Sequence, residues 1–87
     1  MKLKLKNRSG GTVQVEIGDA GRTGGIDILR YTRYGNPDFD FHLVPDGPLY
    51  QLVAFNSRIQ THDDAFIETI DAVTFGEALD IVVNYSF

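Results

Sequence analysis

Apolar and polar residues alternate along much of this chain of 87 residues. Between the segments 35–38 and 45–48, Phe39, Phe41 and Leu43 alternate with Asp40 and His42, which is typical of a strand with one buried and one wet face. Both flanking segments combine Gly and Pro with Asn or Asp. Because these residue types favour tight turns, residues 26–55 are predicted to form three strands joined by two turns.

The first 17 residues predict a β-hairpin. Lys and Leu alternate over residues 2–6, and Val13, Val15 and Ile17 alternate with polar residues after a Gly-containing turn at 7–11. Lysines on an edge strand guard a sheet against unwanted pairing. We therefore expect the three lysines of residues 2–6 to point to solvent, with the leucines and valines facing the core.

Residues 18–25, GDAGRTGG, form the most glycine-rich stretch. Successive backbone amides in such a loop can bind an anion, with Arg22 as a charge partner. The glycine spacing matches neither the dinucleotide fingerprint nor the P-loop, and a strand pattern rather than a helix follows it. The prediction for this segment is a flexible hairpin loop.

The spacing of apolar residues changes after residue 60. Phe66, Ile70 and Val73 lie at i, i+4 and i+7, and no simple alternation separates apolar from polar residues between 65 and 73. This spacing predicts a helix over 61–73 with an acidic stripe along its exposed side.

Residues 74–77, TFGE, fit the capping-box pattern and predict a helix that begins at Thr74. Ala78, Leu79 and Val82 would then face the core. Apolar residues also alternate over 81–87, where β-branched side chains favour a strand. A short terminal strand therefore stays open as the alternative for these last residues.

Together these elements predict an α+β fold. We expect a five-stranded, mostly antiparallel sheet, made of the N-terminal hairpin and the three-strand meander, with one or two C-terminal helices packed on one face. A chain of this length has room for one domain, residues 1–87. It contains no cysteine, which excludes disulfides, thiolate metal sites and a cysteine nucleophile.

Charge is distributed unevenly along the chain. Residues 1–35 contain seven basic and three acidic side chains, whereas residues 36–87 contain one basic and nine acidic side chains, within a net charge of −4. Such asymmetry indicates either a charged partner or pairing between the two halves of the molecule.

The acidic half supplies candidate partner-binding residues, because carboxylates gathered on a helical face would attract a basic protein surface. Tyrosines are enriched at interface hot spots, so the tyrosines at the end of the strand that begins near residue 26 are added. The candidate partner-binding residues are Asp63, Asp64, Glu68, Asp71, Glu77, Asp80, Tyr31 and Tyr34.

Two weaker alternatives concern metal and nucleic acid. Asp38, Asp40 and His42 are expected on one strand face and are ligand types for divalent metals, although a site needs ligands that converge. Arginine and tyrosine near residues 30–34 could stack on bases, but the RRM signature is absent and the acidic balance argues against direct nucleic-acid binding.

No nucleophile elbow, metal box or paired acid and base points to catalysis, so we predict a non-enzyme without a cofactor. The favoured function is a small acidic module that blocks or modulates a basic macromolecular partner such as a nucleic-acid enzyme. In size and charge the chain is similar to phage-encoded inhibitors of bacterial defence, including anti-CRISPR proteins, and to immunity proteins. Alternatives are a small nucleic-acid-binding or metal-binding domain, or a structural protein that forms homodimers. No apolar run predicts a signal peptide or membrane helix, so the expected location is the cytoplasm of a bacterium or a virus-infected host cell.

Overall fold

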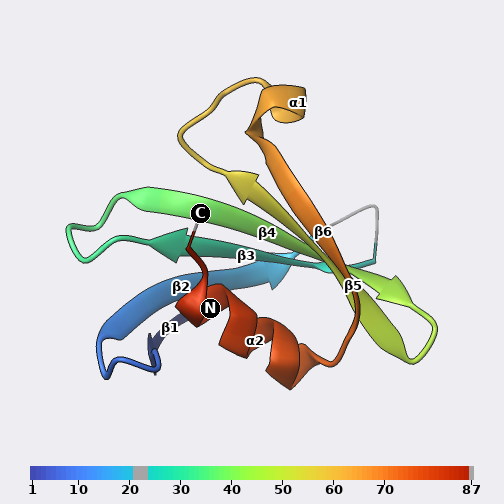
Figure 1. Ribbon diagram of the computed structural model, residues 1–87, viewed down its shortest axis with the longest axis horizontal. Helices are drawn as coiled ribbons and strands as arrows, with labels where there is room; N and C mark the ends of the chain where they lie inside the picture. The colour runs from blue at the N-terminus through green and yellow to red at the C-terminus, as the bar shows by residue number, and fades with distance from the viewer. Residues whose placement is uncertain (21–23, 87) are drawn as a thin grey trace.

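The computed structural model describes residues 1–20 and 24–86, and in this part of the chain six strands form one antiparallel sheet (Figure 1). The strand order in the sheet is the order in the chain, so every strand pairs with its sequence neighbours. The predicted α+β class and antiparallel sheet are confirmed, whereas the predicted count of five strands was one too few. The elements are β1 (Lys2–Lys6), β2 (Thr12–Asp19), β3 (Ile26–Tyr31), β4 (Pro37–Asp46), β5 (Leu49–Asn56), α1 (His62–Ala65), β6 (Phe66–Val73) and α2 (Phe75–Asn84).

The predicted turns join these strands. The Asn7 side-chain oxygen accepts hydrogen bonds from the backbone N–H groups of Ser9 and Gly11, which closes the loop between β1 and β2. Gly47, with φ of 61°, begins the two-residue connection between β4 and β5. Because glycine adopts positive φ without steric cost, this short connection sets the pairing of the two strands.

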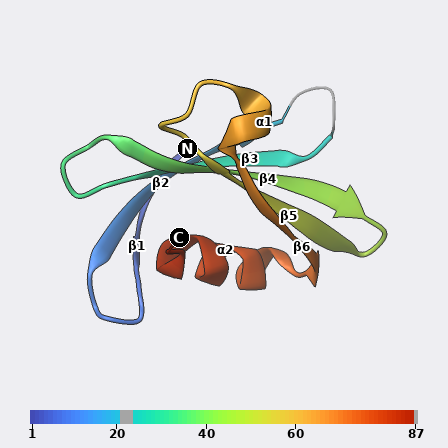
Figure 2. The same cartoon turned by 45° about the horizontal axis from the view of Figure 1, so that its top comes forward.

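One face of the sheet and helix α2 enclose the core. The fully buried side chains on the sheet come from β2, β3, β4 and β5, and α2 adds Ala78 and Val82. Figure 2 shows α2 beneath the sheet and the short helix α1 above it. The sheet members of the core are Val15, Ile28, Phe41, Leu43, Leu52, Ala54 and Val73.

Helix α2 begins with the predicted capping box. The Glu77 N–H donates to the Thr74 hydroxyl at 3.1 Å, and the Thr74 N–H donates to the Glu77 carboxylate at 2.9 Å. Hydrogen bonding from the Thr74 backbone N–H, with a smaller contribution from the Thr74 side chain, lowers the pKa of the Glu77 carboxyl below its ordinary value. The helix continues to Asn84, so the alternative of a strand from residue 81 was wrong. None of the helices in residues 1–20 and 24–86 has the length and apolar character needed to cross a membrane.

The predicted helix over 61–73 was wrong, because only His62–Ala65 is helical and β6 occupies 66–73. The pairing of β6 with β5 is irregular at two places. Glu68 pairs with Ala54 but Phe66 pairs with Phe55, and a second shift, next to Ala72 with φ of 58°, follows before Val73. Each shift inserts an extra residue and breaks the period of two. The apolar residues of a bulged strand therefore fall at spacings that resemble those of a helix.

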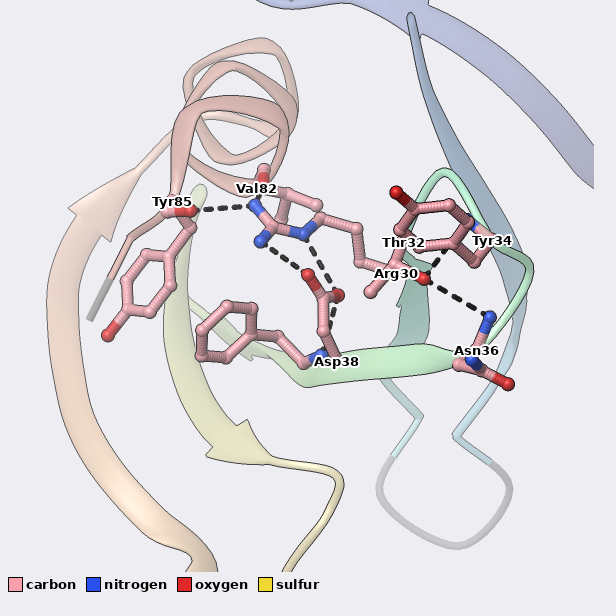
Figure 3. Close-up of polar contacts among 8 residues, drawn as sticks. Arg30, Thr32, Tyr34, Asn36, Asp38, Val82 and Tyr85 are labelled. Atoms are coloured by element: carbon pink, nitrogen blue, oxygen red, sulfur yellow. Dashed lines mark hydrogen bonds and ion pairs between the residues drawn. The ribbon is translucent and has the colours of Figure 1, made fainter.

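Hydrogen bonds from Arg30 of β3 join the C-terminal end of α2 to the sheet (Figure 3). Its Nε and Nη2 atoms donate to the two Asp38 carboxylate oxygens at 3.1 and 2.7 Å. Its Nη1 atom donates to the backbone carbonyls of Val82 and Tyr85 at 2.9 and 2.8 Å. The Arg30 and Asp38 side chains are only 11% and 16% exposed, so this ion pair is largely shielded from water.

We predict that Arg30→Ala lowers the free energy of unfolding by about 3–5 kcal/mol, because it leaves the largely shielded Asp38 carboxylate without its partner. Arg8→Ala is the matched control, since Arg8 forms an ion pair with Asp80 whose side chains are 77% and 55% exposed. Loss of this exposed pair should cost less than about 1 kcal/mol. Urea denaturation of both variants measures the difference, and equal losses would contradict the structural role of Arg30.

Candidate functional site

The sheet face opposite α2 is open over much of its area and has a mixed apolar and acidic surface. Paired residues of neighbouring strands lie on the same face of a sheet. On this face Leu29 pairs with Asp40, and Asp40 pairs with Phe55. In the adjacent row Asp27 pairs with His42, and His42 pairs with Val53. Two neighbouring rows of apolar and polar side chains therefore cross the middle of the sheet on this face.

Helix α1 covers one end of this open face. The His62 ring of α1 lies 4.7 Å from the Phe55 ring, and the His42 ring meets Phe55 edge-on at 5.1 Å. The two imidazoles and Phe55 line a groove of about 310 Å³ together with Val44 and Val53. We call this feature, formed by His42, Val44, Val53, Phe55 and His62, the α1 groove.

Two carboxylates flank His42. Its Nδ1 atom contacts the Asp27 carboxylate, and its Nε2 atom lies 3.8 Å from the Asp40 carboxylate. Burial raises the pKa of the Asp40 carboxyl above its ordinary value; the His42 charge opposes this rise and the Asp27 charge adds to it. The open face therefore holds partly buried negative charge directly beside the α1 groove.

The acidic residues predicted on a helix over 61–73 do not form a helical stripe, because β6 replaces most of that helix. Asp63 and Asp64 are exposed on α1, and Asp71 accepts a hydrogen bond from Gln51 at 2.8 Å. Glu68 lies on the α2 side of the sheet, where the Tyr85 hydroxyl donates to it at 2.5 Å. Desolvation and this carboxylate raise the Tyr85 pKa.

The two acidic residues predicted on the second helix have structural partners. Glu77 is part of the capping box of α2. Asp80 accepts from Arg8 at 2.9 Å, so a basic residue of the first hairpin pairs with it. The other four predicted carboxylates lie along α1 and β6 but on different faces of this edge, and we call Asp63, Asp64, Glu68 and Asp71 the acidic end.

The two predicted tyrosines lie apart from the acidic end. Tyr31 is on β3, and its hydroxyl is 3.4 Å from the Glu16 carboxylate. Tyr34 is 76% exposed in the turn before β4, with the Arg33 guanidinium 4.9 Å from its ring centre. The structure does not bring these residues together with the predicted carboxylates.

The predicted metal ligands Asp38, Asp40 and His42 do not share one face. The pairing of β3 with β4 shifts between Arg30 and Tyr31, which makes Asp38 an extra residue on β4. This bulge turns the Asp38 carboxylate toward Arg30, away from the other two side chains. Across residues 1–20 and 24–86, no group of three or more His, Cys, Asp or Glu side chains is arranged to hold a metal ion.

Arg22, the predicted charge partner of the glycine-rich loop, lies outside the described residues. The groove residues Val44, Val53, Phe55 and His62 were not predicted as functional. The signal that could have identified most of them is the short turn at 47–48. That turn places Val53 opposite His42 and Phe55 opposite Asp40 on the open face.

No protein-family model, curated protein or solved structure matches this chain.

We predict that Asp40→Asn raises the free energy of unfolding at neutral pH. Because burial raises the folded-state pKa, the charged Asp40 carboxylate opposes folding at high pH, and the folded state gains relative stability as pH falls through that pKa. The advantage of the variant should therefore shrink as pH falls, and vanish below the unfolded value of about 3.8.

Urea denaturation between pH 3 and pH 8 measures this dependence. Asp46→Asn is the matched control at the exposed end of β4, where asparagine also suits the following turn. A pH-independent difference for Asp40→Asn, or the same profile in both variants, would contradict the assignment of the effect to burial.

Proposed function

We propose that this protein is a small, non-enzymatic protein-binding module that blocks or modulates a basic macromolecular partner, with the cytoplasm as its compartment. The observation that supports the proposal is the separation of charge across the sheet. β1, at one edge, presents Lys2, Lys4 and Lys6, whereas β6 and α1, at the other edge, present the acidic end. Between residues 59 and 73 there is no lysine or arginine.

The position of the acidic end explains why its charge is not cancelled internally. β1 and β6 are the two outer strands of the sheet, so four strands lie between the basic and the acidic edge. Asp63 and Asp64 are exposed, and residue 71 is exposed as well. Exposed carboxylates of one sign steer an oppositely charged surface and reject acidic partners.

Exposed apolar side chains near the acidic end favour a protein rather than a small ion as the partner. Phe66 is 48% exposed and its ring lies 6.0 Å from that of Phe55, while Ile59 is 41% exposed in the loop before α1. Stable protein interfaces combine an apolar centre with a polar rim. A basic nucleic-acid enzyme is the type of partner that an inhibitor with this surface would fit.

We predict that the triple variant Asp63→Asn, Asp64→Asn, Asp71→Asn loses at least about tenfold in affinity for the partner, because three steering charges are removed. The partner is first identified by capture from cell lysate at low salt and release at high salt, and the dissociation constant is then measured with purified proteins. Glu68 is left unchanged because it accepts the Tyr85 hydrogen bond.

The matched control is Glu16→Gln, Asp19→Asn, Asp46→Asn, which also changes the net charge from −4 to −1. These residues belong to β2 and β4 rather than to α1 or β6, and the control should retain the parent affinity. If the first variant binds as tightly as the parent, or if both variants weaken binding equally, the acidic end is not the binding surface.

A further inference from the structure

We infer that the α1 groove is the anchor site of this surface and accepts a large apolar side chain that is flanked by lysine or arginine in the partner segment. This inference rests on the proposed function and specifies the partner sequence that the surface would recognise.

The lining of the groove suits an apolar side chain. Val44, Val53 and Phe55 line it together with the imidazoles of His42 and His62, around a volume of about 310 Å³. A second hollow of about 200 Å³ adjoins it and shares the two histidines and Phe55 as lining residues. Interface anchors are typically single large side chains in such pockets, surrounded by weaker contacts.

Carboxylates lie next to the two histidines of the groove. Asp27 and Asp40 flank His42 on the sheet, and Asp63 and Asp64 follow His62 directly in α1. No lysine or arginine lines the groove or the adjoining hollow in the described part of the chain. A segment that places an apolar residue in the groove therefore brings its neighbours close to carboxylates, which favours basic neighbours.

The backbone supports the assignment independently of charge. Strict alternation from Glu68 and Ile70, which pair with the core-facing Ala54 and Leu52, would put Phe66 on the α2 face. The bulge between Phe66 and Glu68 instead pairs Phe66 with Phe55 on the open face. Bulges commonly redirect a side chain next to a functional site. Here the redirected ring is half exposed beside the groove.

The test is an NMR titration of labelled protein with the peptide Ac-Gly-Lys-Lys-Leu-Lys-Lys-Gly-NH2. Binding should shift the methyl signals of Val44 and Val53 and the ring signals of His42 and His62. Replacing the leucine by serine should weaken binding at least about tenfold, because the buried apolar contact is lost. Replacing the four lysines by glutamate should abolish binding.

The protein variant Val44→Thr, Val53→Thr should bind the leucine peptide at least about fivefold more weakly, since threonine keeps the shape and strand preference of valine but adds a hydroxyl to the groove. Leu29→Thr is the control on the same face outside the groove, and it should bind as the parent does. If the variant fails to fold, the leucine and serine peptides still decide the question with the parent protein.

Equal affinity for the leucine and serine peptides, or shifts confined to residues outside the groove, would overturn the inference. The partner-binding assay separates it from the proposed function. If Val44→Thr, Val53→Thr retains the partner while the triple aspartate variant loses it, the acidic end binds the partner without the groove. If neither variant loses the partner, both the proposed function and the inference fail.

Discussion

The contact between Arg30 and the end of α2 is the interaction on which the arrangement of helix and sheet depends. A helix leaves its last carbonyls without intrahelical partners and with negative partial charge. The last turn of α2 contains no basic residue of its own, so Arg30 of β3 supplies the cation from the sheet. Four of the five guanidinium N–H groups are used, two by α2 and two by Asp38. At the other end of the helix the capping box pairs N–H groups of the first turn, so both ends of α2 have hydrogen-bond partners.

Holding α2 on one face leaves the opposite face of the sheet available. Helix α2 packs on the face that contains Phe41 and Leu43. On the other face, the single turn of α1 covers only the region around Phe55. The alternating residues of β3 and β4 present Asp27, Asp40 and His42 together on this face. Burial raises the pKa of the Asp40 carboxyl, so the charged form of this side chain opposes folding.

The first five strands and the pairing of β4 with β5 could be predicted from the sequence, because turn residues mark where these strands end. The connection at 47–48 sets β4 against β5, and the alternation of Phe41 and Leu43 with polar residues identifies the core face. The capping box identified the start of α2 in the same local way. Bulges could not be predicted, because an extra residue is defined only by its pairing with the neighbouring strand, which the sequence alone does not give. The bulge at Asp38 and the two in β6 account for the metal-ligand set that does not converge and for the helix that is a strand.

The bulges in β6 that led to the wrong helix prediction also shape the surface proposed for binding. In β6, an uninterrupted alternation would have put Phe66 on the face covered by α2, and the strand would have offered a regular edge for pairing with other chains. Bulges disrupt such edges and thereby limit aggregation. They also leave Glu68 toward α2 and Asp71 toward Gln51, so that carboxylates border both faces of this edge. Acidic charge, an exposed aromatic ring and a protected edge therefore all follow from where β6 departs from regular pairing.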